Sequence, residues 1–469
     1  MTVCSSSRDS TRNRKARWLA GAGIWLQEHQ ILIRRVQWGV VIFYALLLIV
    51  PAFLPLPGIA AHIWNDLTTF AQFVFWGIWW PGVLISMLLF GRLWCGVFCP
   101  EGALSEFASE RGRGLAIPRW VKWPGWPFTA FVLTTVYGQM ISVYQYPKAA
   151  LLILGGSTVG AILIGYLYGR NKRVWCRYLC PVSGVFGLLS KLAPMHYGVD
   201  RAAWDASPPG QKRQMVNCAP LVPIRTMESA SPCHMCGRCS GFRNAIALQA
   251  RRPNEEIVEV SAHSAHRWDS LLIIVGLIGV ALGAFQWSSS PWFIDLKQGA
   301  AFWLVEQGMI WPLETTFPWW ILTDYAEKND VLTLLDGTIL LVYIAATTLF
   351  LSLAVSLSLA LAVRVTGAWQ WQRFHHLAQG LIPFAGGGVI LGLSAQTFTL
   401  LRADGFDLNW VSPLRMVFLL GALSWSLWLV WSILRQQAVP VGRSLIGVTA
   451  IFAGLLVPTY SWVLLFWLW

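Results

Sequence analysis

Two near-copies of one motif, RLWCGVFCP at residues 92–100 and RVWCRYLCP at residues 173–181, each follow directly on a long apolar run. Each copy therefore places two cysteines at a membrane surface, Cys95 with Cys99 and Cys176 with Cys180. A third cysteine run, Cys233-x2-Cys236-x2-Cys239, lies in the polar stretch after the second copy. Thiolates at these spacings are typical ligands of iron–sulfur clusters, so the pattern predicts a membrane protein that moves electrons.

The composition supports a membrane location. Of the 469 residues, 56% are hydrophobic and only 12% are charged, with a mean hydropathy of +0.54. Soluble domains carry about 25% charged residues. The net charge of +13 could suggest nucleic acid as a partner. We expect no nucleic acid, because the basic residues have a simpler use as signals of membrane topology.

The apolar runs predict an all-α integral membrane protein of about nine transmembrane helices, with a small cytoplasmic ferredoxin-like insert. The expected spans are 36–54, 70–90, 127–146, 150–168, 270–287, 338–362, 377–401, 414–434 and 446–468. The segment 299–322 is also apolar, but it contains Glu306, Pro312, Glu314 and Pro318. We therefore expect it to form an interfacial or re-entrant helix on the outer surface.

The basic residues predict the orientation of these spans. With a cytoplasmic N-terminus, 30 of the 35 Lys and Arg residues fall on the inner side. The outer loop 288–337 is acidic instead. This asymmetry follows the positive-inside rule, and it places all nine cysteines on the reducing, cytoplasmic side.

Four segments follow from this arrangement. Residues 1–35 form a cytoplasmic basic segment whose first seventeen residues we expect to be disordered, and residues 36–168 form two transmembrane hairpins with the first motif. Residues 169–269 form a cytoplasmic segment with the second motif and the ferredoxin-like insert, and residues 270–469 form a cysteine-free membrane block of about five helices. Packing of the two hairpins around a pseudo-two-fold axis would bring the four motif thiols together.

The insert contains an incomplete ferredoxin motif. Its run begins correctly, but the fourth position is Arg243, and the following Ala245–Leu248 resembles the strand after a ferredoxin loop. Cys218 is the natural replacement, which gives one [4Fe–4S] cluster on Cys218, Cys233, Cys236 and Cys239. A three-iron cluster without Cys218 and a structural zinc site are the alternatives.

The remaining thiols of the two copies, Cys95, Cys99, Cys176 and Cys180, predict a second [4Fe–4S] cluster and leave Cys4 spare. The i, i+4 spacing places two thiols on one face of a helical turn, and each proline can begin a new helix. A regulatory disulfide or copper binding is the alternative. Five arginines close to the ligands would balance the negative charge of the clusters: Arg92, Arg173, Arg177, Arg238 and Arg243.

Other side chains carry weaker signals. The pairs His375–His376 and His263/His266 lie outside the spans, so we interpret them as solvated or interfacial. His234 follows a ligand directly and could hydrogen-bond to cluster sulfur. Gln139, Gln379 and Gln396 are candidates for a quinone pocket, and Glu101 and Glu106 could relay protons or cap the next helix.

Membrane hairpins that end in W-C-x3-C-P, followed by a ferredoxin-type cysteine run, resemble the NosR/NapH-type membrane polyferredoxins over about residues 36–260. The resemblance implies a bacterial inner-membrane protein that passes electrons to or from quinol, flavin or periplasmic redox proteins. The family often carries two complete ferredoxin motifs, whereas this chain has one incomplete motif. The extension 270–469 resembles the polyferredoxin subunit of ferrous-iron uptake systems, which implies a permease subunit as a partner.

The residues and the resemblance together favour an electron carrier within a larger redox system rather than a stand-alone enzyme, with membrane lipid around it. We expect two [4Fe–4S] clusters, with quinone or flavin as a further cofactor. The alternatives are a metal-handling membrane protein whose thiols carry copper or iron, and a transporter whose cysteines sense redox state.

Overall fold

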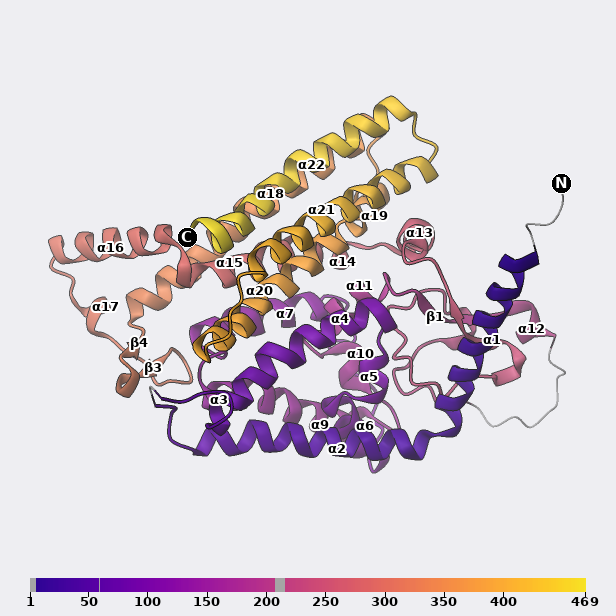
Figure 1. Cartoon of the computed structure of the whole chain (residues 1–469), viewed down its shortest axis with the longest axis horizontal. Helices are drawn as coiled ribbons and strands as arrows, with labels where there is room; N and C mark the ends of the chain where they lie inside the picture. Colours follow the sequence, from indigo (N-terminus) through magenta and orange to yellow (C-terminus); the bar gives the residue numbers. More distant parts are fainter. Residues whose placement is uncertain (1–5, 59, 207–215) are drawn as a thin grey trace. The chain divides into compact units, whose positions relative to one another are not determined.

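The structure is a computed structural model that describes residues 6–58, 60–206 and 216–469, with side chains described from residue 17 onward. Figure 1 follows the chain by colour. Cys4 lies outside the described residues. The N-terminal tail was expected to be disordered, but α1 (Ser6–Glu28) is helical from Ser6, so that expectation is wrong for residues 6–17.

The all-α membrane fold is confirmed. Among the described residues, eight helices are long and apolar enough to cross a membrane. They are Gln30–Phe53, Leu67–Phe90, Pro147–Tyr168, Arg267–Ser289, Leu334–Thr366, Ile382–Ala403, Val411–Gln436 and Val441–Leu468. Each overlaps one of the expected spans. In lipid, a run of about 20 apolar residues forms a helix because a helix satisfies all of its own backbone hydrogen bonds.

The segment expected to cross at 127–146 forms a shorter helix, α7 (Trp126–Met140). Its 15 residues extend about 22 Å, less than the roughly 30 Å of a hydrocarbon core. A turn follows Met140, in which Ser142 adopts a left-handed backbone with φ of 49°. The length of α7 alone therefore does not decide whether this helix crosses the membrane.

The region around 299–322 contains no long apolar helix. Its elements are α16 (Pro291–Glu306), α17 (Trp311–Glu314) and a small hairpin in which β3 (Asp324–Tyr325) pairs antiparallel with β4 (Asp330–Val331). The helix begins earlier than expected, directly after the span Arg267–Ser289, because Pro291 occupies the first turn.

The chain divides into two compact units. The first contains residues 1–45, 83–126 and 157–260. Its elements include α5 (Leu93–Val97), α6 (Pro100–Glu110), α10 (Val174–Tyr178), α11 (Ser183–Ser190), β1 (Met195–Val199), α12 (Arg201–Asp205) and β2 (Ile246–Ala250). Most of α2 (Gln30–Ile49), α4 (Trp80–Phe90) and α9 (Gly156–Tyr168) also belongs to it.

The insert of the first unit is built on a two-stranded sheet. β1 pairs antiparallel with β2, from Met195 opposite Ala250 to Val199 opposite Ile246. The strand expected after the ferredoxin loop is therefore present. Helix α1 packs on this sheet, and a Cβ added at Gly23 would lie 3.1 Å from the Cβ of Leu248, so glycine permits the close approach.

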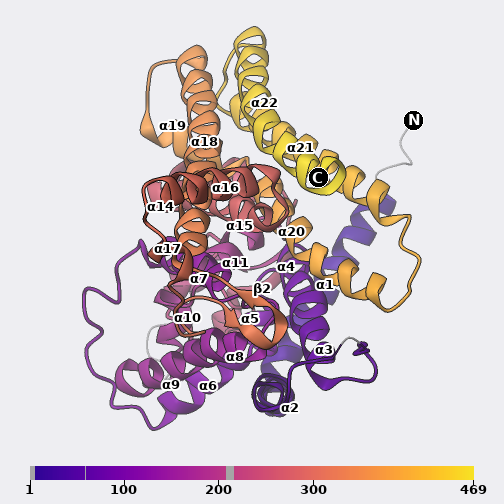
Figure 2. The same ribbon diagram turned by 90° about the vertical axis from the view of Figure 1, so that its left-hand side faces the viewer.

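The second unit contains residues 46–82, 127–156 and 261–469. Its elements include α3 (Leu67–Gln72), α8 (Pro147–Ala150), α13 (Ser261–Ser264), α14 (Arg267–Leu271), α15 (Ala281–Gln286), α18 (Leu334–Thr366), α19 (Trp371–Gln379), α20 (Ile382–Ala403), α21 (Val411–Gln436) and α22 (Val441–Val463). Helices α18 and α22 run side by side in Figure 1 and in Figure 2.

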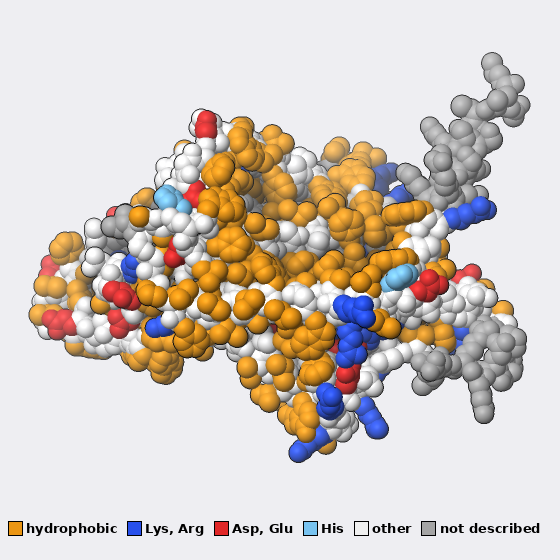
Figure 3. Space-filling view, turned by 60° about the horizontal axis from the view of Figure 1, so that its bottom comes forward, with side chains coloured by type: hydrophobic (Ala, Val, Ile, Leu, Met, Phe, Trp, Pro, Cys, Tyr) orange, Lys and Arg blue, Asp and Glu red, His pale blue; other side chains and the backbone are white. Residues whose placement is uncertain are grey.

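The surface is that of a lipid-exposed protein. Large apolar side chains cover much of the face seen in Figure 3. On α18, for example, Leu353, Leu357 and Leu361 are exposed, while Val355 and Leu359 on the other side are fully buried. A soluble helix would bury its apolar face and expose polar residues, so this pattern indicates that α18 faces hydrocarbon.

Candidate functional site

The two motif copies form the same local structure. In the first copy, the backbone N–H groups of Phe98 and Cys99 both donate to the carbonyl of Trp94 at 2.9 Å. In the second copy, Leu179 and Cys180 donate to the carbonyl of Trp175 in the same way, at 2.9 and 3.0 Å. A single short helical turn, α5 or α10, thus carries the first cysteine of each pair, and the second cysteine follows directly.

The prolines differ between the copies. Pro100 is the first residue of α6, as expected, and the thiol of Cys99 caps this helix by accepting from the N–H of Gly102 at 3.4 Å. After the second copy, α11 begins only at Ser183, so Pro181 does not begin a helix. The expectation for the proline is therefore confirmed in the first copy and wrong in the second.

The two copies lie against each other. Arg173 of the second copy donates through Nη1 to the carbonyl of Cys95 at 2.6 Å. In the other direction, Arg92 donates to the hydroxyl of Ser183 at 3.1 Å, and Ser183 donates to the carbonyl of Cys176. Glu101 also accepts from the indole N–H of Trp175 at 3.2 Å. Side chains from each copy therefore fix the backbone of the other.

These contacts gather the four cysteines of the two copies, here called the motif group: Cys95, Cys99, Cys176 and Cys180. Each of the four thiols interacts electrostatically with the other three. Burial, reinforced by Glu101 and the neighbouring thiols, raises the pKa of Cys180 well above its ordinary value. Burial also raises the pKa of Cys176 to about 12, against the lowering effect of the Arg173 guanidinium.

The other four cysteines form a second set, the insert group: Cys218, Cys233, Cys236 and Cys239. They line one hollow, together with Tyr197, His234 and Arg238. Each thiol again interacts electrostatically with the other three. Burial, followed by the neighbouring thiols, raises the pKa of Cys239, and burial raises the pKa of Cys233 to about 12. Cys218 thus lies where the sequence required a fourth thiol.

The C-x2-C-x2-C loop brings its thiols together through residues with a left-handed backbone conformation. Met235 has a φ of 54° and Gly237 a φ of 80°. The turn directs the N–H of Met235 to the sulfur of Cys233 at 3.4 Å. Arg243, at the position of the missing ligand, also has a positive φ of 56°, but its guanidinium lies 5.1 Å from the Trp204 ring centroid.

Buried cations surround both groups. The side chain of Arg173 is 1% exposed, and its Nε donates to Glu106 at 2.7 Å. Burial would raise the pKa of Glu106, but Arg173 and Arg238 outweigh it and lower that pKa. Glu106 has no sequence signal beyond its place after the first copy, and nothing in the spacing of Arg173 and Arg238 pointed to a shared partner.

Several buried polar groups beside the cysteines have no hydrogen-bond partner among the residues that the structure describes. They are Nε of Arg92, Nη2 of Arg173 and the ring of His234, whose two nitrogens are both unpaired, one a donor and one an acceptor in the neutral imidazole, and whose side chain is 1% exposed. An unsatisfied buried donor costs about 1–3 kcal/mol. Sulfur atoms of an anionic iron–sulfur cluster are acceptors of the kind that would satisfy these donors, so the residues present fit such a group.

Neither group is shaped for a single ion. Within residues 6–58, 60–206 and 216–469, no three His, Cys, Asp or Glu side chains are arranged to hold one metal ion. A tetrahedral zinc with sulfur at about 2.3 Å would require thiols roughly 3.8 Å apart.

The other histidines make local polar contacts. His375 pairs with the hydroxyl of Ser270 at 2.9 Å, and Nδ1 of His376 lies 3.1 Å from Nε2 of Gln437. His266 lies 3.5 Å from Asp269. His376 is only 1% exposed, so of the two interpretations, solvated or interfacial, the solvated one is wrong for this residue.

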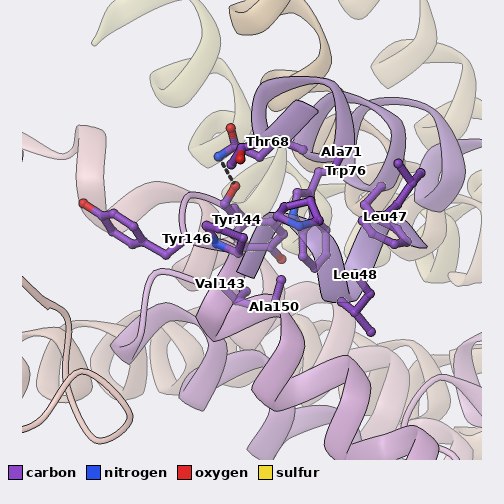
Figure 4. A pocket seen from close by; sticks show the side chains of 13 residues that line it. Leu47, Leu48, Thr68, Ala71, Trp76, Val143, Tyr144, Tyr146 and Ala150 are labelled. Atoms are coloured by element: carbon purple, nitrogen blue, oxygen red, sulfur yellow. Dashed lines mark hydrogen bonds between the residues drawn. The ribbon is translucent and has the colours of Figure 1, made fainter. Parts of the chain in front are cut away.

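A further hollow lies in the second unit and is shown in Figure 4. Its lining is mostly apolar and includes Trp76 and Tyr144, and Gln72 donates to the carbonyl of Tyr144 at 2.8 Å. Its volume of about 20 Å³ is close to that needed for one water molecule. None of Gln139, Gln379 and Gln396 lines it; Gln139 accepts from Trp287, and Gln379 donates to Asp269.

Comparison with known proteins agrees with this geometry. Residues 72–118 and 151–199 match the 4Fe-4S binding domain, and each matched segment contains one copy of the motif. The chain is 25% identical over 242 residues to the putative electron transport protein YccM of Escherichia coli K12, covering 44% of this chain and 65% of that protein.

The chain also resembles two regulatory proteins NosR. It is 27% identical over 188 residues to that of Pseudomonas aeruginosa, covering 34% of this chain and 25% of the relative. It is 29% identical over 124 residues to that of Stutzerimonas stutzeri, covering 22% and 17%. The chain thus spans less than two thirds of each of these relatives, and no solved structure matches it significantly. The predicted resemblance to membrane polyferredoxins is confirmed, and the chain carries a 4Fe–4S binding domain.

Proposed function

We propose that this polyferredoxin-type membrane protein transfers electrons through two [4Fe–4S] clusters on the cytoplasmic side of the bacterial inner membrane. One cluster would bind to the motif group and the other to the insert group. Each cluster supplies a site that accepts and releases one electron. The observation that carries the proposal is the division of eight cysteines into two sets of four: one set lines a single hollow, and the other lies on two motif copies whose cysteine carbonyls accept hydrogen bonds across the contact between them.

The chain's own residues would hold and tune these centres. The N–H groups of Gly102 and Met235 already point at the sulfurs of Cys99 and Cys233. The unpaired buried N–H groups of Arg92, Arg173 and His234 would favour a more negative centre. Burial of the thiols limits the access of water, which also affects the reduction potential.

For the partner, we propose quinone or a periplasmic redox protein, with flavin as the alternative carrier. An electron carrier needs both an electron donor and an electron acceptor. The membrane block 270–469 offers an apolar surface and a water-facing surface where such partners could bind. A permease subunit of a ferrous-iron uptake system is the partner implied by the resemblance of this block.

The test is anaerobic purification of the full chain with measurement of iron, acid-labile sulfide, zinc and copper. We expect about eight iron and eight sulfide per chain, with a paramagnetic signal after reduction. Cys180→Ser and Cys236→Ser should each remove roughly half of the iron, because each removes one ligand from a different group. Stoichiometric zinc or copper in place of iron would overturn the proposal and favour the metal-handling alternative.

A further inference from the structure

Glu106 joins the two cysteine groups through one carboxylate. Its Oε2 accepts from Nε of Arg173 at 2.7 Å, and its Oε1 accepts from Nη1 of Arg238 at 2.6 Å. Arg173 begins the second motif copy, whereas Arg238 lies between two cysteines of the insert group. The carboxylate is 15% exposed and Arg173 is 1% exposed. One largely buried acid therefore holds one cation from each group.

Arg173 is placed close to both groups. Its Nη1 donates to the carbonyl of Cys95, and a Cβ added at Gly102 would lie 3.2 Å from that nitrogen and 3.5 Å from the Cβ of Cys99. The guanidinium also interacts electrostatically with Cys176 and with Cys236. Its charge acts on a thiol of the motif group and on a thiol of the insert group at the same time.

The backbones of the two groups are in direct contact at Gly96. A Cβ at this position would overlap the carbonyl oxygen of His234 and lie 3.0 Å from the Cα of Cys236. Helix α2 holds both loops from one side. Gln37 donates to the carbonyl of Gly96 at 2.9 Å, and Gln30, two turns earlier, donates to the carbonyl of Cys236 at 3.0 Å.

From these contacts we infer that the two groups form one coupled redox pair, in which Glu106 is the positioning residue that sets the reduction potential of both centres. The inference rests on the proposed function. One electron passes from one centre, which is oxidised, to the other, which is reduced, and no bond is made or broken. The Gly96–His234 contact is the direct route between the groups, and Arg173 and Arg238 supply the shared charge.

The main test is a redox titration of the purified chain, followed by EPR, with Glu106→Gln compared with Glu110→Gln. Both substitutions remove one negative charge from α6. Glu110 pairs with Arg34 at the surface, where the two side chains are 32% and 52% exposed. We expect Glu106→Gln to shift both midpoint potentials to more positive values, because less negative charge opposes the added electron. Glu110→Gln should leave both potentials unchanged, since exposed charges are screened.

A second variant tests the contact itself. Gly96→Ala should weaken the magnetic interaction between the two reduced centres, whereas Gly39→Ala should not, because a Cβ at Gly39 has no neighbour within 4 Å. Iron and sulfide content is measured for every variant, so loss of a centre is distinguished from loss of coupling.

The outcomes separate the inference from the proposed function. A wild-type chain without iron–sulfur centres would overturn the proposed function. The coupled pair would be overturned if the two centres titrate without magnetic interaction. It would also be overturned if Glu106→Gln shifts the midpoint potential of one centre only or of neither. Both results would leave the proposed function standing.

Discussion

Cys218 is the thiol whose role depends most on the folded chain. It lies fifteen residues before the next cysteine of its group, yet it lines the same hollow as the other three and interacts with Cys236. The N–H of Val222 donates to it, and the Lys172 ammonium lies near enough to lower its pKa against the dominant effect of burial. The fourth thiol beside the ferredoxin run thus comes from a separate loop.

We therefore expect Cys218→Ala to lose about four of eight iron atoms or to convert the insert centre into a three-iron form, which is paramagnetic when oxidised. Iron analysis and EPR of the oxidised protein distinguish the two results. Cys4→Ala is the matched control, because the sequence leaves this cysteine without a partner motif. Spectra and iron content equal to those of wild type would remove Cys218 from the ligands.

The spacing of the cysteines was enough to predict the two sets, because few kinds of site use cysteines at these intervals. The hydrogen bonds that hold the cysteine loops in place could not be predicted in this way. Glu106, Gln30 and Gln37 meet the cysteine loops across more than fifty residues of chain, and only the packed structure brings them together. His234 was found from sequence because it is adjacent to a ligand.

At the scale of elements, helices α18 and α22 of the second unit pack through small residues. Ala354, Ser358 and Ala362 recur every fourth residue on α18, which is one helical face. Opposite them on α22, a Cβ at Gly454 would overlap the hydroxyl of Ser358 and lie 3.3 Å from the carbonyl of Ala354. Close approach between helices is a main source of association within lipid, where burial of apolar surface gives no advantage.

Gly454→Val should therefore destabilise the second unit by about 1–3 kcal/mol, the usual cost of overpacking. The measurement is the thermal unfolding of the detergent-solubilised full chain, scored by helical signal. Gly442→Val lies on the same helix, where an added Cβ meets no atom within 4 Å, and should melt like wild type. Equal melting of both variants would show that α18 and α22 do not require this contact.

The element boundaries show which features the apolar pattern resolves. Eight spans were expected close to where they occur, because a continuous apolar run allows one structure in lipid. The end of α7 was not predicted from the sequence. It depends on a left-handed turn at Ser142, and serine does not usually indicate a left-handed turn. The early start of α1 was also missed, because a polar and basic segment carries no periodic signal.

At the scale of the whole molecule, the contact between the motif copies limits how the chain between them can cross the membrane. The first copy follows the span Leu67–Phe90, and the second follows the span Pro147–Tyr168. Arg173 of the second copy donates to the carbonyl of Cys95 in the first, so both copies lie on one side of the membrane. The chain between them must therefore cross an even number of times, and Pro147–Tyr168 is one helix there that is long and apolar enough to cross.

The other crossing must lie between residues 91 and 146, and in this part of the described chain α7 is the apolar helix available. A helix of about 22 Å can span a bilayer where the bilayer thins locally. Aromatic residues such as Trp123 and Trp126 can also lie at the membrane interface. If α7 crosses together with the eight long helices, the chain has nine crossings, and we expect its two ends to lie on opposite sides.

This count predicts the result of reporter fusions. A reporter after Trp469 should be active only if it functions in the periplasm, and one in loop 201–230 only if it functions in the cytoplasm, because 30 of 35 basic residues then lie inside. A third reporter between Ser142 and Gln145 tests α7 directly and should behave as periplasmic. If it behaves as cytoplasmic, α7 does not cross, the two motif copies are separated by the membrane, and no cofactor can be shared by Cys95, Cys99, Cys176 and Cys180.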